Sequence, residues 1–300
     1  MKKCPRCKQS GGDTQRFCDH CNTELFFPER FKNPEQSPQQ SILTLYFSAT
    51  GNTEYIANLF SRQMNAHCLS IEAEADFTSE IKSHDTIAFC YPIYGSRVPR
   101  IMREFVAKYM SDLSGKKLII FVTQMLFSGD GARVFTDMFW EETVTVIYAE
   151  HFYMPNNVCN LPMLRHVSKH GIRKYKQKAE AKMLRVCSNI NQGIVKKRGF
   201  SRFSEWLGNL QGRLWQGDSR DISPTAGMEY RASKDVRIRC HCNACGVCVQ
   251  ICPMKNLTNQ DGRIEQQGNC TVCYRCVNHC PQKAITVLFH RLPKWQYKGV

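Results

Sequence analysis

The middle of the chain alternates short apolar runs with amphipathic stretches. Runs rich in β-branched and aromatic residues predict five buried strands, at 42–47, 67–71, 86–91, 118–122 and 144–149. Helical periodicity predicts helices at 53–64, 99–110, 132–140 and 162–190. Strands that alternate with helices are typical of an α/β fold, so we expect an open, five-stranded parallel sheet. Ligands of such sheets bind beyond the carboxyl ends of the strands.

The C-terminal part follows a different pattern, which is set by cysteine spacing. A C-x2-C-x2-C-x3-C-P run occupies residues 242–253 and recurs at residues 270–281. In such a run three thiolates bind one 4Fe–4S cluster, and the fourth cysteine binds the neighbouring cluster. We therefore expect one cluster on Cys242, Cys245, Cys248 and Cys280, and another on Cys270, Cys273, Cys276 and Cys252. Zinc is the alternative, but it prefers pairs of C-x2-C that longer loops separate.

The repeat continues beyond the cysteines, because residues 253–258 align with residues 281–286. This duplicated unit resembles a bacterial two-cluster ferredoxin. The resemblance implies a small α+β domain, which we place at residues 236–300. Cys240 is out of register with the first run and is expected not to bind a cluster. Tyr274 and Arg275 lie between ligands, where an aromatic ring and a cation can shield a cluster and tune its potential.

The N-terminus carries two C-x2-C knuckles within residues 1–25. Their spacing predicts a small zinc ribbon with four thiolate ligands, Cys4, Cys7, Cys18 and Cys21. A rubredoxin-type iron site uses the same ligands, but Lys8 and Asn22 stand where its knuckles usually carry glycine. Residues 26–40 contain prolines among polar residues and are expected to form a linker.

The loop after the first predicted strand has the composition of a phosphate-binding site. It reads Ser48-Ala49-Thr50-Gly51-Asn52-Thr53. Hydroxyl groups, a glycine and a helix N-terminus together supply hydrogen-bond donors for a phosphate group. The loop is neither a Walker loop nor a dinucleotide-binding G-x-G-x-x-G. It resembles the phosphate loop of flavodoxins, [S/T]-x-T-G-x-T, and this resemblance implies that its six residues bind FMN. An ordinary helix cap is the alternative.

Two later loops extend the resemblance to flavodoxins. The loop after the third predicted strand contains Pro92, Tyr94 and Gly95. By resemblance, Tyr94 stacks on the flavin ring and Gly95 offers a flexible peptide group to it. The loop after the fourth predicted strand contains Phe127 and Gly129. In this loop the aromatic position is shifted by one residue, so Phe127 is either a second stacking residue or part of the core.

The loop after the fifth predicted strand reads Met154-Pro155-Asn156-Asn157. It resembles a Met-Pro-x-Asn element in fusion proteins of anaerobic bacteria, which join a flavodoxin-like domain to a two-cluster ferredoxin. The order of motifs over residues 41–290 is similar to that family. His151 is a candidate proton donor near a reduced flavin, but a lone histidine is more often a structural residue, and we prefer that interpretation.

Residues 193–235 are expected to be a basic helical connector that follows a flavodoxin-like domain at residues 41–192. Apolar residues recur there at helical spacing: Phe203, Trp206, Leu207, Leu210 and Leu214. We expect this helix to pack on the sheet domain or to bridge to the ferredoxin-like domain, because Gly208 and Gly212 weaken an isolated helix. An interfacial helix on an anionic membrane is the alternative.

Charge and cysteine content narrow the classes of function. The 300 residues carry a formal net charge of +15, and residues 164–240 supply +12 of it, with 18 Lys/Arg and 6 Asp/Glu. A solvated basic face is the ordinary explanation, and charge alone does not choose between it, an acidic protein partner, and nucleic acid or anionic lipid. Together with the cluster and flavin motifs, the charge leads us to expect an acidic electron-carrier protein or a low-potential reductase as partner, while nucleic acid is not expected. The cysteine spacings, with no signal peptide and no apolar run of about 18 residues, indicate a cytoplasmic protein without a membrane span.

Two clusters and a flavin together predict an iron–sulfur flavoprotein. Such a protein transfers electrons between two 4Fe–4S clusters and FMN, and links one-electron donors to a two-electron acceptor. The first alternative is an FMN-dependent reductase of a small organic substrate near Tyr94, Met154 and Asn156. The second alternative is a redox-sensing or nucleic-acid-associated protein.

Overall fold

The computed structural model describes residues 2–3, 10–11, 41–127, 129–139, 143–216, 218, 220–223 and 225–300. The chain divides into two compact units, Met1–Gln39 and Gln40–Val300. In the first unit, the described residues form strands β1 (Lys2–Lys3) and β2 (Ser10–Gly11), which pair antiparallel. The four cysteines of the predicted zinc ribbon and the predicted linker lie outside the described residues.

The second unit is built around a parallel sheet of six strands in the order β4-β3-β5-β6-β7-β8. These are β3 (Ile42–Tyr46), β4 (His67–Ser70), β5 (Thr86–Pro92), β6 (Lys117–Gln124), β7 (Thr145–Tyr153) and β8 (Lys196–Lys197). The predicted parallel α/β sheet is confirmed, but the predicted number of five strands is wrong. The sixth strand, β8, consists of two exposed lysines in the segment predicted to be a helical connector. Two residues are too few for an alternating pattern to reveal.

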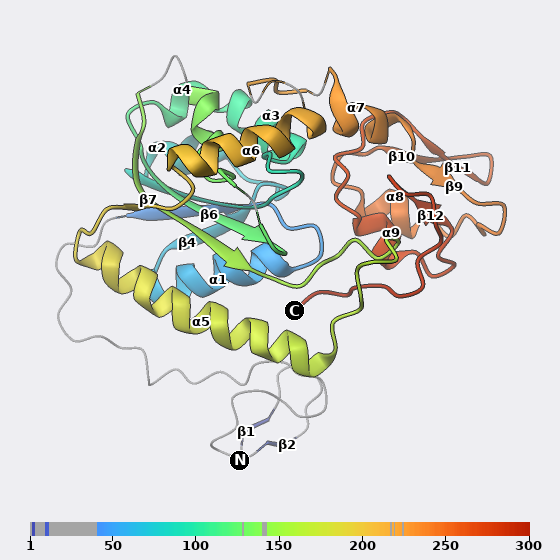
Figure 1. The fold of residues 1–300 in the computed structure, drawn as a ribbon, viewed down its shortest axis with the longest axis horizontal. Coiled ribbons are helices and arrows are strands. Elements are labelled where there is room, and N and C mark those ends of the chain that lie inside the picture. Colours follow the sequence, from blue (N-terminus) through green and yellow to red (C-terminus); the bar gives the residue numbers. More distant parts are fainter. Residues whose placement is uncertain are drawn as a thin grey trace. The chain divides into compact units, whose positions relative to one another are not determined.

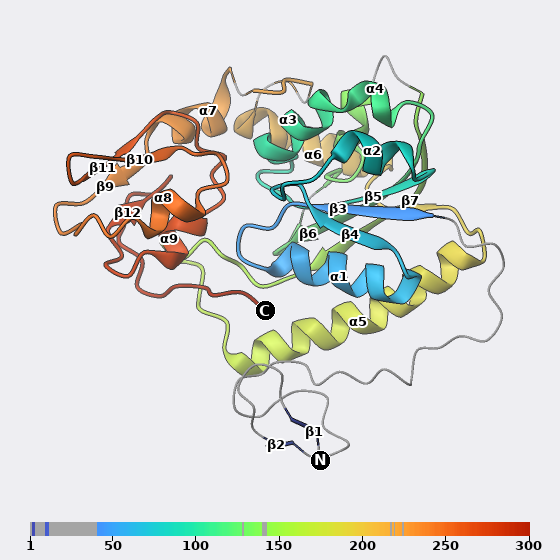
Figure 2. The same cartoon turned by 180° about the vertical axis from the view of Figure 1, so that it is seen from behind.

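Helices cover both faces of the sheet (Figures 1 and 2). On one face lie α1 (Asn52–Met64) and α5 (Lys169–Asn191). On the other face lie α2 (Phe77–Lys82), α3 (Arg100–Lys108), α4 (Met110–Leu113), the 3-10 helix η2 (Val134–Phe139) and α6 (Arg202–Trp215). The segment predicted as a helix at 132–140 is therefore a 3-10 helix, and the helix predicted from residue 162 begins at Lys169.

The sheet buries an apolar core on each face. Leu45 and Phe89 face the side of α2 and α3, where Met102 packs against them. Cys90 and Phe121 belong to the opposite core, which includes Phe60 of α1 and residues of α5. Because both faces are covered, the strands read as nearly continuous apolar runs in the sequence. Among the described residues, no helix is both long and apolar enough to cross a membrane.

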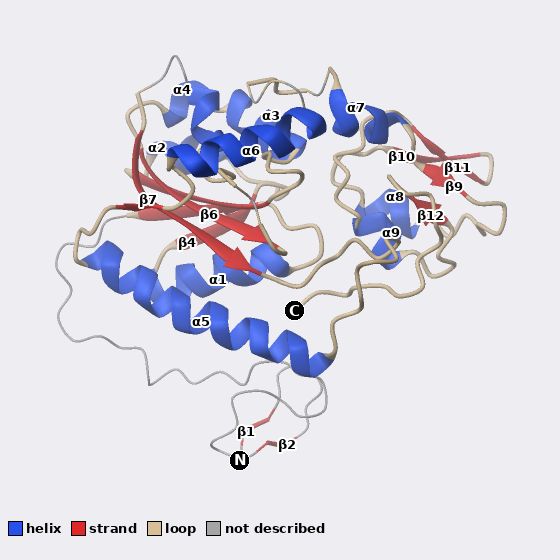
Figure 3. Cartoon of the chain, viewed as in Figure 1, coloured by secondary structure: helices blue, strands red, loops and turns tan. Residues whose placement is uncertain are grey.

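The C-terminal part is made of short elements joined by loops (Figure 3). They are α7 (Gly227–Lys234), β9 (Arg237–Ile238), α8 (Val247–Ile251), β10 (Leu257–Gln260), β11 (Arg263–Gln266), α9 (Arg275–His279) and β12 (Ile285–Thr286). Strand β9 pairs antiparallel with β12, and β10 pairs with β11. The sequence repeat is also a backbone repeat, because positive φ angles occur at Ala244, Gly246 and Lys255 and again at Val272, Tyr274 and Lys283.

Candidate functional site

A cavity of about 450 Å³ lies at the carboxyl ends of strands β3, β5, β6 and β7. Its volume falls in the range of small-molecule sites, roughly 300–1,000 Å³. Nine of the eleven residues predicted to bind the flavin line it: Ser48, Ala49, Thr50, Asn52, Thr53, Pro92, Tyr94, Gly95 and Phe127. The other two, Gly51 and Gly129, are not part of the lining.

The loop between β3 and α1 presents backbone donors toward a ligand. Gly51 is the N-cap of α1 and has a φ of 94°, a conformation that residues with a side chain rarely adopt. Because glycine has no side chain to cap the helix, the N–H groups of the first turn lack a capping acceptor. Among the described residues, the N–H groups of Ala49 and Thr50 have no acceptor either. Such a cluster of donors at a helix N-terminus is suited to an anion.

The side chains of Asn52 and Thr53 fix this loop in place. Asn52 Nδ2 donates to the carbonyl of Pro155 at 2.7 Å, and Asn52 Oδ1 accepts from the Tyr297 hydroxyl at 2.5 Å. The Thr53 hydroxyl lies 2.7 Å from the hydroxyl of Thr123 at the end of β6. These contacts tie the loop to neighbouring loops. The Gly51 N–H donates to Ser48 Oγ at 3.1 Å, so the N–H groups of Ala49 and Thr50 and those of the first turn of α1 are the part left for a ligand.

Three buried polar atoms around the cavity have no hydrogen-bond partner among the described residues. They are the Tyr94 hydroxyl, Gln124 Oε1 and Trp215 Nε1, and all three residues line the cavity. Buried donors and acceptors nearly always have a partner, so these atoms indicate a ligand with polar groups. A flavin ring carries N–H and carbonyl groups along its edge and fits this requirement.

Sequence reasoning missed Gln124 and Trp215. Gln124 ends strand β6, so the rule that ligands bind at the carboxyl ends of parallel strands was a signal that could have found it. Trp215 ends helix α6 and packs directly on Gly95, where an ideal Cβ would lie 2.4 Å from Trp215 Cγ. That contact joins residues far apart in the sequence, and no local pattern predicts it.

Tyr94 lies between the cavity and the C-terminal cysteines. It packs against both the sheet core and the C-terminal core. Burial raises the pKa of Tyr94 well above its ordinary value, and the nearby thiols of Cys273 and Cys270 raise it further, while Arg275 opposes them. The residue predicted to stack on a flavin therefore also borders the second cysteine run.

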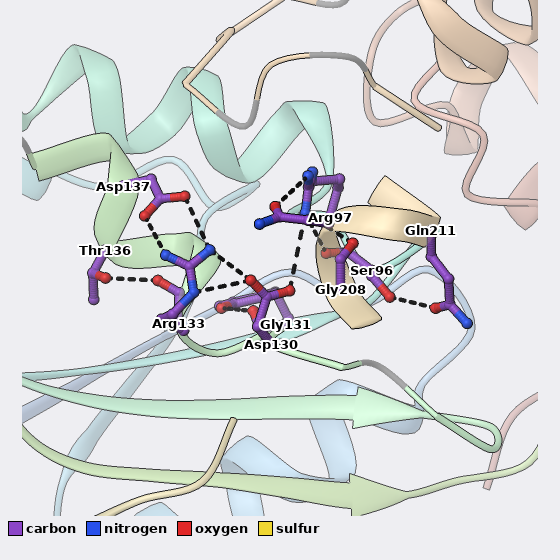
Figure 4. Close-up of polar contacts among 11 residues, drawn as sticks. Ser96, Arg97, Asp130, Gly131, Arg133, Thr136, Asp137, Gly208 and Gln211 are labelled. Carbon is purple, nitrogen blue, oxygen red and sulfur yellow. Dashed lines mark hydrogen bonds and ion pairs between the residues drawn. The ribbon is translucent and has the colours of Figure 1, made fainter. Parts of the chain in front are cut away.

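Helix α6 forms a wall of the site and is bonded to the loop after β5: Arg97 Nη1 donates to the carbonyl of Gly208 at 3.4 Å, and the Ser96 hydroxyl donates to Gln211 Oε1 at 2.6 Å (Figure 4). An ideal Cβ on Gly129 would lie 2.7 Å from the Cα of Gly208, so the loop after β6 packs directly on the helix. Next to this contact, Arg97 Nη1 lies 3.9 Å from Asp130 Oδ1, and both side chains are buried. Gly212 leaves room for Arg97, whose Cζ would lie 2.0 Å from an added Cβ. Gly129 thus supports the wall from outside the cavity.

Most of the apolar stripe that predicted α6 faces solvent, and only Leu207 is partly buried. The other four members are 56–68% exposed: Phe203, Trp206, Leu210 and Leu214. The helix packs on the sheet domain, which is one of the two arrangements expected from the sequence. It packs through Gly208, Gly212 and Trp215 and not through the apolar stripe. The glycines that count against an isolated helix are the residues that permit this close approach.

The thiols of the C-terminal cysteines gather in two groups. Burial, followed by the thiols of Cys280, Cys242 and Cys245, raises the pKa of Cys248 to about 11. These neighbours are the residues that the sequence predicts to share a cluster with Cys248. Four cysteines of the other predicted set line one small cavity, Cys252, Cys270, Cys273 and Cys276. Their role as cluster ligands stays a prediction.

Backbone N–H groups donate to cysteine sulfurs in both groups. Asn256 N lies 3.2 Å from Cys252 Sγ, and Ala284 N lies 3.3 Å from Cys280 Sγ. The two bonds occupy equivalent places in the repeat. Hydrogen bonds of this kind favour the thiolate form and help to set the reduction potential of an iron–sulfur site.

His151 lies within a strand, because β7 continues to Tyr153 instead of ending at Ala149. Burial lowers the pKa of His151 to about 4, so the imidazole is neutral at pH 7. His151 is not among the residues that line the cavity. This placement agrees with the structural interpretation and gives no support to His151 as a proton donor to a flavin.

The comparisons with known proteins concern the sheet domain. A family model described as flavodoxin domain matches residues 43–183. The chain is similar in structure to a Trp repressor binding protein from Bacillus subtilis, with 12% identity, a TM-score of 0.36 and coverage of 47% of this chain and 96% of that chain. It is also similar to the two-electron reduced flavodoxin of Megasphaera elsdenii, with 21% identity, a TM-score of 0.33 and coverage of 47% and 98%.

A third similar structure is a flavoprotein in complex with FMN from Lactobacillus acidophilus, with 13% identity, a TM-score of 0.31 and coverage of 37% and 93%. The comparison with curated proteins found no match. The family match makes the sheet domain flavodoxin-like, as its motifs predict.

Proposed function

We propose that the chain is an iron–sulfur flavoprotein that transfers electrons between two 4Fe–4S clusters and FMN. One observation carries the proposal: the second cysteine group borders the cavity of the flavodoxin-like domain. Val272 and Tyr274 flank Cys273 in the sequence and line that cavity. The carbonyl of Cys273 also accepts a hydrogen bond of 3.1 Å from Asn157 in the loop after β7, which lines the cavity too.

The cavity residues fit FMN at both ends. At the phosphate end, the loop from Ser48 to Thr53 offers backbone donors and the N-terminus of α1. At the ring end, Tyr94, Gln124 and Trp215 offer polar atoms that have no partner among the described residues. Phe127 and Trp215 supply aromatic surface along the same lining. The side chains would bind and orient the flavin and exclude water from its ring.

The cysteine groups fit clusters better than single zinc ions. Zinc prefers pairs of C-x2-C that longer loops separate, whereas each C-terminal run places three cysteines two residues apart and a fourth before a proline. This spacing supports cubane clusters on the two groups.

The bound cofactors would supply one-electron transfer at the clusters and exchange between one- and two-electron transfer at the flavin. The protein's own contribution is position and environment. Asn157 and Asn278 hold the two domains together at the cavity, since Asn278 Nδ2 donates to the carbonyl of Asn157 at 2.8 Å. An acidic electron carrier or a low-potential reductase stays the proposed partner, because the chain has a net charge of +15.

The reductase alternative receives less support. Met154 and Asn156 line the cavity, as that alternative requires. However, Met154 is buried in the core, and both ends of the Asn156 carboxamide bind the backbone of Val158, at 2.9 and 3.1 Å. These contacts already hold both side chains in place, which favours a structural role for them. The N-terminal zinc ribbon stays a prediction, because its cysteines lie outside the described residues.

Anaerobic purification of the full chain tests the proposal. We expect a brown protein with about eight iron and eight sulfide ions per chain, as two 4Fe–4S clusters require, and extractable FMN. Cys276→Ser should remove about half of the iron. Cys240→Ser, at an exposed cysteine, is the matched control and should keep all of it. A colourless protein, or one with zinc on its C-terminal cysteines, would refute the iron–sulfur part, and a protein that binds no FMN would refute the flavin part.

A further inference from the structure

The side chain of Arg275 extends from the C-terminal part of the chain to a loop of the sheet domain. Arg275 lies between Cys273 and Cys276 in the second cysteine run. Its Nη2 atom donates to the carbonyl of Ser48 at 2.7 Å, and its Nε atom donates to the carbonyl of Ala49 at 3.0 Å. Both carbonyls belong to the loop predicted to bind phosphate. One guanidinium group therefore joins the second cysteine group to the other cofactor site.

Two further partners hold Arg275 in this position. Glu72, in the loop after β4, accepts from both Nη atoms at 2.6 Å. The carbonyl of Ile251 accepts from Nη1 at 3.1 Å, and Ile251 directly precedes Cys252. The side chains of Arg275 and Glu72 are 16% and 26% exposed, so this bidentate pair is partly shielded from water. The same group thus contacts both segments that carry the cysteines of the second group.

The contact with Ser48 and Ala49 also orients the donors of the phosphate loop. In a planar trans peptide, the C=O and N–H groups point in opposite directions. Because Arg275 binds the carbonyls of Ser48 and Ala49, the N–H groups of Ala49 and Thr50 are directed away from the guanidinium. These are the N–H groups that have no acceptor among the described residues.

We infer that Arg275 couples the binding of FMN to the assembly of the cluster on Cys252, Cys270, Cys273 and Cys276. This inference rests on the proposed function. With a cluster bound to Cys273 and Cys276, the backbone on both sides of Arg275 would be fixed. The Arg275 side chain would then hold the phosphate loop in its binding form. Coupling between two sites is reciprocal, so bound FMN stabilises the cluster to the same extent. The chain would then load both cofactors together and avoid a half-assembled form.

The test compares FMN affinity with and without iron. Apoprotein and anaerobically reconstituted protein are titrated with FMN, and the dissociation constant is read from quenching of flavin fluorescence. We expect reconstituted wild-type protein to bind FMN at least about fivefold more tightly, the lower end of typical coupling between sites. In Arg275→Gln this ratio should fall to about one. Arg263→Gln, at an exposed arginine of β11, makes the same charge change in the same domain and should keep the ratio.

A reciprocal measurement follows the iron itself. Loss of iron to a chelator should be slower in wild-type protein with FMN than without it, and FMN should give no such protection in Arg275→Gln. If Arg275→Gln does not fold, Glu72→Gln weakens the same contact from the other side and should reduce the ratio. Equal FMN affinity of the iron-free and iron-loaded wild-type protein would refute the coupling and leave the proposed function intact. Failure of wild-type protein to bind iron or FMN would refute the proposed function itself.

Discussion

Gly208→Ala tests how α6 is held against the sheet domain, because two effects on the helix oppose each other. Alanine is a better helix former than glycine by about 0.8–1.0 kcal/mol, so propensity alone predicts a more stable protein. The structure predicts the reverse. An ideal Cβ on Gly208 would lie 1.6 Å from Asp130 Oδ1 and 2.4 Å from Asp130 Cγ. Carbon and oxygen atoms in contact need about 3.5 Å, so one side has to move by about 2 Å.

Asp130 cannot easily make that movement. Its carboxylate is fully buried and accepts from Arg133 Nε at 2.9 Å, while Arg97 lies on its other side. The helix must therefore shift, which separates Gly208 from Gly129 and loosens the buried pair. Overpacking costs about 1–3 kcal/mol, and a loosened buried pair adds part of the about 3–5 kcal/mol that breaking it would cost. From a combined cost of about 3–5 kcal/mol and a propensity gain of about 1 kcal/mol, we expect the free energy of unfolding to fall by about 2–4 kcal/mol.

Urea unfolding, followed by tryptophan fluorescence, measures this change. Arg213→Ala on the exposed face of α6 is the matched control, and it should change the free energy of unfolding by less than about 0.5 kcal/mol. Because Gln211 and Trp215 of the same helix line the cavity, Gly208→Ala should also weaken FMN binding. A Gly208→Ala protein as stable as the wild type, or more stable, would refute the packing argument.

Four further predictions follow from buried groups. Glu229→Gln should lower the free energy of unfolding by about 3–5 kcal/mol in urea titrations, because it leaves the buried Arg103 guanidinium, 3.0 Å away, without its counter-charge. Acid should destabilise the protein through His151, because burial lowers its folded pKa to about 4, below the ordinary 6.5. The folded state then binds fewer protons than the unfolded state, so the free energy of unfolding should fall by about 3 kcal/mol between pH 6.5 and 4. His151→Gln should remove this pH dependence from urea titrations, and an unchanged dependence would contradict the assignment. Burial raises the pKa of Glu150, but the neighbouring lysines outweigh it and lower the pKa to about 2. The free energy of unfolding should therefore fall further below pH 4.5, and Glu150→Gln should abolish this second decrease in the same titrations. Trp215→Phe should weaken FMN binding about tenfold in fluorescence titrations, because it deletes one indole donor to the ligand, and unchanged affinity would place the flavin elsewhere.

The sequence predicted the parts of the fold that depend on local pattern. Apolar runs located β3 to β7 because a sheet covered on both faces needs continuous apolar strands. It could not locate β8, whose two lysines pair with Tyr148 and Ala149 only after the chain has folded. It also extended the α5 helix too far toward its N-terminus, although Ser168 caps the helix by accepting from Gly171 N at 3.1 Å.

The candidate site divides in the same way. The sequence located those loops of the site that carry a recognisable motif: nine residues predicted from flavodoxin-type motifs line the cavity. Residues that reach the site from distant segments were not found, because their role depends on tertiary contacts. Arg275 was interpreted as a shield for a cluster, whereas its guanidinium binds the loop of Ser48 and Ala49, more than 200 residues earlier in the chain. Spacing identifies which residues can bind a group, but not which neighbour a long side chain will reach.

Helix α6 shows why an apolar stripe alone does not decide which face of a helix is buried. The stripe from Phe203 to Leu214 gave the correct periodicity, yet four of its five side chains are exposed to solvent. The buried face carries Gly208 and Gly212 because backbone contact with Gly129 and room for the Arg97 guanidinium require residues without a side chain. Glycines four residues apart in a helix can therefore indicate close packing as well as weakness. In this chain, that close packing is what brings Trp215 to the cavity, so the wall of the proposed flavin site depends on two residues that carry no chemistry of their own.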